Sequence, residues 1–199
     1  MKILPRSFYE RDTAQVAYNL LGKRIVRVLD GNYLEGIIAE TEAYHSEDPA
    51  SHSYRGQTER NKSMFGPVGY TYVYLSYGLH YCLNIVAKDS TKYLSGAVLI
   101  RAIIPSGGQE IIERNRKKTI SFLISGPGNV TQALALTKAH DGIDVTKNDS
   151  PLLITEGIII DPSAIAATKR IGISVAQEVL WRFVINTSTC KRVYKDILE

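Results

Sequence analysis

The sequence predicts an α+β fold that forms a single domain over residues 1–199. Segments with the alternating, β-branched and aromatic character of strands outnumber helical segments, and the short turns between them favour antiparallel pairing. The hydrophobic fraction of 44% is enough to fill a core, and no linker-like stretch divides the chain. We therefore expect a curved antiparallel β-sheet with flanking helices and a protruding β-hairpin.

The expected elements follow from hydrophobic periodicity and turn residues. Ser7 is placed to cap the first helix, and the turn Asp30-Gly31-Asn32 joins the first two strands. A long polar loop from Tyr44 to Pro67 follows, and loops of this length are often functional. In chain order we expect a helix at Ser7–Leu21, strands at Lys23–Leu29 and Tyr33–Thr41, the hairpin at Tyr70–Val86, a strand at Ala97–Ile104, helices at Gln109–Arg116 and Gly128–Thr137, and strands at Leu152–Ile160 and Trp181–Asn186.

Composition and charge limit the class of protein. The apolar runs are too short for a membrane span, and the N-terminus turns polar before a signal-peptide core can form. Cys82 and Cys190 lack the Cys-x-x-Cys spacing of metal or redox sites, and the four histidines lack ligand spacing. We expect a soluble cytoplasmic protein that holds no metal. The net charge of +4 permits a polyanionic partner without requiring one.

Two carboxylates share one face of a strand near its end. By period-two alternation Glu40, Glu42 and Tyr44 point to the same side. Two interpretations are open. In the first, this is an ordinary solvated face, because charged side chains mostly stay exposed. In the second, one carboxylate is a general base at the end of a strand, where a loop can present substrate.

The hairpin carries aromatic residues in two different settings. Tyr70, Tyr72 and Tyr74 share one face, which suits either packing or base stacking. Tyr77 lies in the turn, where a large ring has little to pack against, so it fits a wedge that enters between base pairs. Asn84 is unusual in a strand, and we expect it to make a specific hydrogen bond.

The length of the turn decides which hairpin residues share a side. We expect a three-residue turn, Ser76-Tyr77-Gly78, with Gly78 in the left-handed conformation. This odd length places Tyr74 opposite His80 and Tyr70 opposite Asn84, so that Tyr74 and Asn84 face one pocket. A two-residue turn would put Asn84 on the wrong face.

Two further polar residues have open assignments. Arg101 interrupts an apolar strand, so it is expected to meet either a buried carboxylate or a phosphate. His52 lies between two serines in the long polar loop. It is either a neutral residue that hydrogen-bonds and positions a ligand, or an ordinary surface histidine.

Several short motifs occur in a fixed order over most of the chain. They are Glu40-Thr41-Glu42-Ala43-Tyr44, Ser51-His52-Ser53, Thr58-Glu59-Arg60-Asn61-Lys62-Ser63-Met64-Phe65, Tyr72-Val73-Tyr74-Leu75-Ser76-Tyr77-Gly78, Cys82-Leu83-Asn84, Val98-Leu99-Ile100-Arg101-Ala102, Ser125-Gly126-Pro127, Gln132-Ala133-Leu134-Ala135 and Arg170-Ile171-Gly172. Each is weak alone, but the ordered set is specific. It resembles the alkyladenine (3-methyladenine) DNA glycosylase family.

The resemblance implies a pocket for a purine that has been flipped out of duplex DNA. Glu42 matches the general base that activates the attacking water. Tyr44 and Tyr74 match the aromatic pair that sandwiches the flipped base, and His52 matches the residue that closes the pocket with a hydrogen bond.

The remaining matches concern the DNA around that base. Tyr77 matches the intercalating tip, Asn84 the amide that discriminates against the amino group of guanine, and Arg101 a basic residue near the flipped nucleotide. The resemblance implies a monomer that binds double-stranded DNA with an alkylated or deaminated purine. It would hydrolyse the N-glycosidic bond without a cofactor and leave an abasic site.

Two other functions use the same residues. The first is a non-catalytic module that recognises damaged or single-stranded nucleic acid through its aromatic residues. Glu42 argues against it, since a carboxylate near a phosphodiester backbone opposes binding. The second is a structural tyrosine-rich β domain with no nucleic-acid role, which leaves Tyr77 unexplained.

Overall fold

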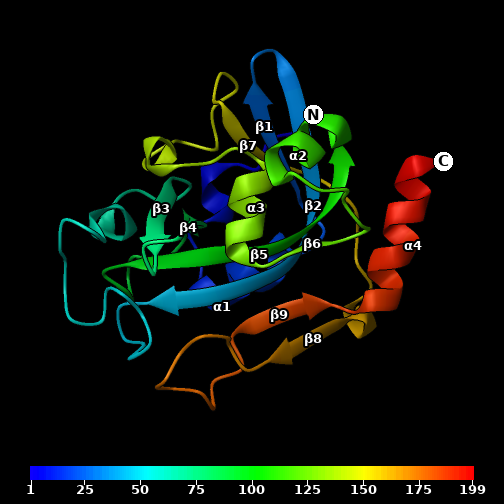
Figure 1. The fold of residues 1–199 in the computed structure, drawn as a ribbon. Helices are drawn as coiled ribbons and strands as arrows, with labels where there is room; N and C mark the ends of the chain where they lie inside the picture. The colour runs from blue at the N-terminus through cyan, green and yellow to red at the C-terminus, as the bar shows by residue number, and fades with distance from the viewer.

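A curved antiparallel sheet occupies the centre of the protein, and the computed structural model describes residues 1–199 (Figure 1). The strands are β1 (Arg24–Leu29), β2 (Asn32–His45), β3 (Thr71–Ser76), β4 (His80–Val86), β5 (Gly96–Gly107), β6 (Ile124–Ser125), β7 (Leu152–Thr155), β8 (Ile165–Thr168) and β9 (Arg182–Ile185). The main path through the sheet runs β3-β4-β5-β2-β1-β7, while β6 pairs with β5 and the β8–β9 hairpin joins β2 through β9. The long central strands β2 and β5 therefore contact most of the others.

Four α-helices and four 3-10 turns surround the sheet. The helices are α1 (Thr13–Leu20), α2 (Gln109–Arg116), α3 (Pro127–Ala133) and α4 (Thr187–Leu198), and the turns are η1 (Arg6–Phe8), η2 (Lys62–Phe65), η3 (Lys138–His140) and η4 (Pro162–Ala164). α1 packs on β2 and β5, α3 on β4 and β5, and α4 on β5. None of the helices combines the length and apolar character needed to cross a bilayer.

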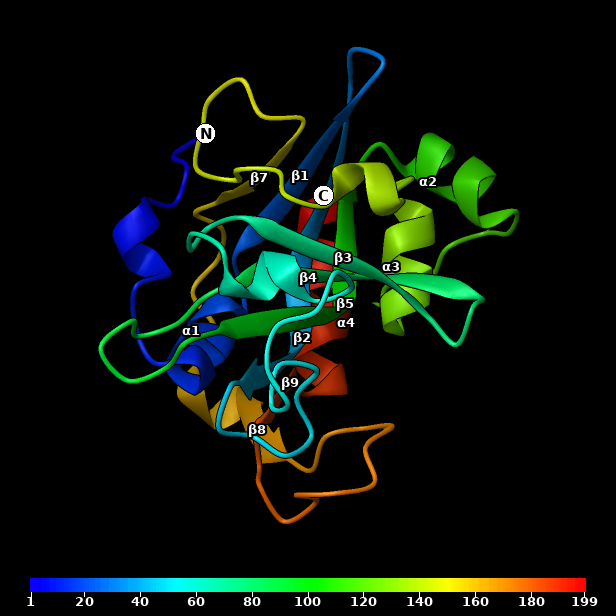
Figure 2. The same ribbon diagram turned by 90° about the vertical axis from the view of Figure 1, so that its left-hand side faces the viewer.

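The core forms where these helices meet the central strands. Val16 of α1, Ile38 of β2, Ile103 of β5 and Val130 of α3 are fully buried in one apolar cluster. The predicted α+β class, with an antiparallel sheet and flanking helices, is confirmed. In Figure 1 the β3–β4 hairpin lies at the left and α4 at the right, and Figure 2 shows the hairpin extending beside α3.

The first helix begins later than predicted. Ser7 lies in the turn η1, and α1 starts at Thr13 because Asp12 caps it. One carboxylate oxygen of Asp12 accepts hydrogen bonds from the backbone N–H groups of Ala14 and Gln15, at 3.0 and 3.1 Å. These bonds satisfy two of the free donors at a helix start, so Asp12 rather than Ser7 sets the boundary.

Other boundaries also differ from the sequence prediction. β2 continues to His45 and so contains the whole Glu40–Tyr44 segment. α3 ends at Ala133 rather than Thr137, and Ala135 just beyond it has a left-handed φ of 50° that cannot continue a helix. β7 ends at Thr155 rather than Ile160.

The C-terminal part contains two elements that the sequence analysis missed. β8 is short and half exposed, so its hydrophobic pattern is weak. α4 starts at Thr187 and is capped by Asn186, whose side chain accepts a hydrogen bond from the N–H of Thr189 at 2.9 Å. This is an ordinary helix cap that the sequence does display.

The loop at the tip of the β3–β4 hairpin has the predicted odd number of residues, but the two strands pair in a different register. Ser76 pairs with His80, which leaves three loop residues, and Gly78 is left-handed with φ 69°. The odd length and the left-handed glycine are confirmed. The individual pairs are shifted, because Tyr74 lies opposite Cys82 rather than His80.

The shift arises because Tyr77 is left-handed as well, with φ 51°. The tight turn is Tyr77-Gly78, closed by a 3.0 Å bond from the Leu79 N–H to the Ser76 carbonyl, and Leu79 is the extra residue. A tyrosine in the left-handed conformation is strained. Its cost is about 1–2 kcal/mol, and such strain is typical of functional sites.

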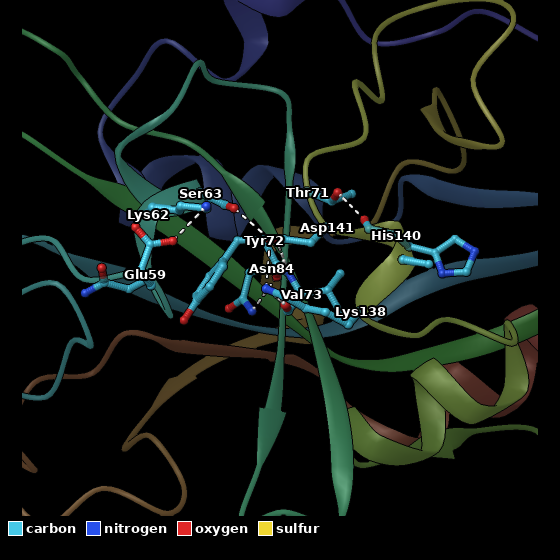
Figure 3. A network of polar contacts seen from close by, with 12 residues as sticks. Glu59, Lys62, Ser63, Thr71, Tyr72, Val73, Asn84, Lys138, His140 and Asp141 are labelled. Carbon is cyan, nitrogen blue, oxygen red and sulfur yellow. Dashed lines mark hydrogen bonds and ion pairs between the residues drawn. The ribbon is translucent and has the colours of Figure 1, made fainter.

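A neighbouring segment satisfies the outer edge of β3. The Val73 N–H donates to Asp141 Oδ1 at 2.8 Å, and Lys138 Nζ donates to the Val73 carbonyl at 3.0 Å (Figure 3). Ser63 Oγ donates to the other oxygen of Asp141 at 2.8 Å. Pairing these edge groups fixes the strand that carries Tyr74 and leads to the exposed tip.

Candidate active site

All seven site residues predicted from the sequence line one cavity of about 670 Å³. This volume lies within the range of small-molecule sites. The cavity lies between the central strands, the hairpin and the loop that follows β2. The residues are Glu42 and Tyr44 from β2, His52 from the loop, Tyr74, Tyr77 and Asn84 from the hairpin, and Arg101 from β5.

Glu42 is a fully buried carboxylate with three hydrogen-bond donors. Tyr44 Oη and Arg101 Nη1 donate to Oε2 at 2.7 and 3.3 Å, and the Ile171 N–H donates to Oε1 at 2.8 Å. A buried charge needs such partners to offset its desolvation. The interpretation of this strand face as solvated is therefore wrong.

Arg101 reaches these carboxylates because the β2–β5 ladder is irregular. Thr41 pairs with Ile100 and Glu40 with Ala102, so Arg101 is an extra residue that a bulge directs toward the cavity. Its Nε donates to Glu40 Oε1 at 2.9 Å. Burial alone would lower the pKa of Arg101, but the charges of Glu42 and Glu40 outweigh it, and the pKa lies above its ordinary value. Of the two partners expected for Arg101, the structure shows the carboxylate.

Tyr44 extends the cavity wall beside Glu42. Burial, and then the charge of Glu42, raise the pKa of the Tyr44 phenol well above its ordinary value. The group therefore stays protonated and donates to the carboxylate at 2.7 Å. This bond holds the ring and the carboxylate in one fixed arrangement.

His52 packs against two tyrosines of the hairpin. Its ring meets Tyr74 edge to face with centroids 4.6 Å apart, and its Nδ1 lies 3.1 Å from Tyr72 Oη. Tyr72 and Tyr74 in turn are stacked at 5.3 Å. Although part of His52 is exposed, desolvation of the ring and then the charge of Arg60 lower its pKa, which keeps it neutral near pH 7.

Asn84 and Tyr77 differ sharply in their exposure. Asn84 is buried between β3 and β5, and its Nδ2 donates to the Tyr72 carbonyl at 3.1 Å (Figure 3). The specific hydrogen bond expected for Asn84 is thus present. Tyr77 is 88% exposed at the hairpin tip, on the rim of the cavity. An aromatic ring with so little to pack against is available to an external partner.

Several residues of this cavity were not predicted from the sequence. Tyr72 was assigned only to the tyrosine face, yet it is the hydrogen-bond partner of His52. Ile171 contributes its backbone N–H, which no side-chain pattern reveals. The other missed residues that line the cavity include Arg60, Met64, Cys82, Leu99, Pro127 and Ile173.

Comparison with known proteins identifies the family. The sequence profile described as "Methylpurine-DNA glycosylase (MPG)" matches residues 7–189. The chain belongs to the methylpurine-DNA glycosylase family. The family resemblance expected from the motifs is confirmed, and the chain is a DNA glycosylase whose partner is DNA. A non-catalytic binding module and a structural tyrosine-rich domain are both inconsistent with this membership.

Similar proteins cover almost the whole chain. A protein of Carboxydothermus hydrogenoformans is 44% identical over 94% of this chain and 96% of its own length. One from Rhodopseudomonas palustris is 44% identical over 93% of this chain and 88% of its own, and one from Agrobacterium fabrum 43% identical over 93% and 90%. All three are named as candidate 3-methyladenine DNA glycosylases.

Proposed function

We propose that this glycosylase excises alkylated and deaminated purines of the 3-methyladenine, 7-methylguanine and hypoxanthine type from duplex DNA. A water activated by Glu42 would attack C1′ of the flipped nucleotide, and the C1′–N bond would break. The base would leave with the bonding electrons, as a neutral molecule when it is N-alkylated and as an anion that takes up a proton from solvent when it is hypoxanthine, and an abasic site would remain. The observation that carries the proposal is a fully buried carboxylate lining an aromatic cavity whose rim bears an exposed tyrosine.

The hydrogen bonds of Glu42 support the role of general base. A carboxylate offers about four lone-pair sites, and three of those on Glu42 accept bonds from Tyr44, Arg101 and the Ile171 N–H. Oε1 accepts only the Ile171 bond among these, so it retains a site for a water molecule. That water would transfer its proton to Glu42 as its oxygen bonds to C1′.

The aromatic residues support binding of an electron-poor purine. The rings of Tyr44 and Tyr74 both line the cavity and offer π faces on which a base can stack. An N-alkylated purine is cationic, and a cation is attracted to such a face. Because His52 is neutral near pH 7, it adds no positive charge to oppose that base.

Tyr77 and Asn84 support two further parts of the proposal, the extrusion of the nucleotide and the discrimination against normal guanine. The exposed ring of Tyr77 would enter the base stack and fill the space that the extruded nucleotide leaves. The amide of Asn84, fixed by its bond to the Tyr72 carbonyl, would oppose the exocyclic amino group of a normal guanine.

A single assay tests this function. The purified protein is incubated with an end-labelled duplex that carries one hypoxanthine, and the product is treated with hot alkali. We expect strand breaks at the lesion from the wild-type protein and none from the matched undamaged duplex. If the wild-type protein binds the damaged duplex but produces no alkali-labile site, the proposed reaction is wrong.

A further inference from the structure

A buried ion pair, Arg170–Asp48, lies directly behind the residues of the proposed active site. Both side chains are almost fully inaccessible to solvent. The guanidinium contacts both oxygens of Asp48, with Nη2 at 3.0 Å from Oδ1 and Nη1 against Oδ2. The same Nη1 donates to the Ala43 carbonyl at 2.9 Å. This pair lies outside the roles discussed above.

The ion pair joins three segments that are far apart in the sequence. Ala43 lies on β2 between Glu42 and Tyr44, and Asp48 lies in the loop that leads to His52. Arg170 lies in the segment after β8, and the next residue, Ile171, donates its N–H to Glu42 at 2.8 Å. Holding the Arg170 side chain therefore holds that donor in place.

The guanidinium also supports the Tyr44 ring. It lies over this ring at 4.7 Å from the centroid, and over the Trp181 ring at 5.3 Å. Burial alone would lower the pKa of Arg170, but the hydrogen bonds and charge of Asp48 outweigh it, and the pKa lies above its ordinary value. The arginine is therefore a permanent cation beneath a ring that lines the cavity.

We propose that Arg170 and Asp48 are positioning residues for excision, which fix the Ile171 donor on Glu42 and the Tyr44 ring behind the flipped base. This inference rests on the proposed function of Glu42 and Tyr44. Asp48 also contributes through its charge, which balances that of Arg170. Without it, an uncompensated positive charge would lie beneath Tyr44 and repel a cationic purine.

A buried ion pair alone is weak grounds for a stabilising role, because desolvation offsets much of its attraction. The location of this pair is more specific. The guanidinium contacts Asp48, the β2 backbone beside Glu42 and the ring of Tyr44, which lines the cavity, and it also lies over Trp181, which does not. A displacement of about 1 Å at an active site can cost about 100-fold in rate.

The experiment compares Arg170→Lys and Asp48→Asn with a matched control, Arg6→Lys. Arg6 is also paired with an aspartate, Asp144, at 2.6 Å and lies over a tyrosine ring, but it does not line the proposed site. Single-turnover excision is measured on duplexes with hypoxanthine, a neutral base, and with 7-methylguanine, a cationic base. Affinity is measured separately on a duplex whose lesion carries a fluorine at C2′ and resists cleavage. Each variant is assayed below the onset of its own thermal melting.

We expect Arg170→Lys to lower the excision rate on both lesions equally, by about 10- to 100-fold, with little change in affinity. Asp48→Asn should slow excision of 7-methylguanine at least about threefold more than that of hypoxanthine, because only it leaves an unbalanced charge. Arg6→Lys should match the wild type. A structural role alone would not alter the ratio between the lesions.

Two results would overturn the inference. One is a wild-type excision rate in Arg170→Lys. The other is an Asp48→Asn variant that slows both lesions alike or that loses affinity in place of rate. If Arg170→Lys does not fold, the lesion ratio of Asp48→Asn decides alone. Failure of the proposed function is distinguishable, since then the wild-type protein itself would not release either base.

Discussion

Replacing Glu42 by glutamine removes the proposed base and preserves the size of the side chain. The substitution also disturbs the hydrogen bonds around this side chain. Oε2 accepts two bonds, from Tyr44 and Arg101, and Oε1 accepts one from the Ile171 N–H. The amide nitrogen of glutamine must take one of these places. If the amide nitrogen replaces Oε2, it faces the Arg101 donor, and if it replaces Oε1, it faces the Ile171 N–H. Two donors meet in either case, so at least one hydrogen bond is lost.

The expected magnitudes follow from these contacts. A buried donor left without its acceptor costs about 1–3 kcal/mol, and a protein of this size loses about 2–4 °C in Tm per kcal/mol. Loss of a general base costs about 10²–10⁴-fold in rate, or roughly 3–5 kcal/mol in the barrier. Glu42→Gln should therefore melt several degrees lower and excise at least about 100 times more slowly, while affinity for damaged DNA stays within a few-fold.

The assay is single-turnover excision of hypoxanthine, with affinity measured on the uncleavable duplex. Glu40→Gln is the matched control, because it makes the same change two residues earlier on the same strand. Glu40 accepts bonds from Arg101 and Arg182 on one oxygen, at 2.9 and 2.7 Å, and it does not line the cavity. We expect it to lose far less activity. If Glu42→Gln keeps more than about a tenth of the wild-type rate, below the usual effect of a general base, Glu42 is not the base.

Three further outcomes are expected. Tyr77→Ala should reduce excision from a fully paired duplex more than from a mismatch, where less unstacking is required; equal losses would argue against a wedge. No lysine lines the cavity, so borohydride should trap no covalent DNA adduct, and a trapped adduct would disprove a purely hydrolytic mechanism. Finally, desolvation of the His52 ring and the charge of Arg60 lower its folded pKa, while the unfolded chain takes up a proton below about pH 6.5. Stability is thus lost as the pH falls from about 6.5 through the lower folded pKa, and His52→Gln should show a smaller drop in Tm between about pH 7 and pH 5 than the wild type.

Local patterns in the sequence predicted the elements with strong signals. The bounds of α2 at Gln109–Arg116 agree, and β5 contains the apolar strand expected at Ala97–Ile104. The odd hairpin loop predicted from the sequence is also present, and only an odd loop brings Tyr74 and Asn84 to the same side. Weakly patterned elements such as β8, which is short and half exposed, gave no usable signal.

The site was less predictable than the fold, because its geometry depends on long-range contacts. Alternation places Glu42 on one face of β2, but it does not say whether that face is buried. Two of the donors that satisfy the buried carboxylate come from Ile171, more than a hundred residues away in the chain, and from Arg101, which a bulge redirects. Neither the irregular register nor a backbone donor leaves a recognisable mark in the sequence.

The charged residues around Glu42 determine how much net charge a cationic purine would meet in the proposed site. Six charged residues form two connected groups beneath the cavity: Glu40, Glu42, Asp48, Arg101, Arg170 and Arg182. Their formal charges cancel, three negative against three positive. Under the proposed function, these six residues together would neither attract nor repel a cationic purine, while Arg60, which also lines the cavity, adds one positive charge. Selection would then fall to the tyrosine faces and the shape of the slot. Each arginine has a carboxylate partner other than Glu42, namely Glu40 or Asp48, and only Arg101 contacts Glu42 as well, at 3.3 Å. Glu42 is therefore not the main partner of any arginine, which suits the proposed role as the base that accepts a proton from water.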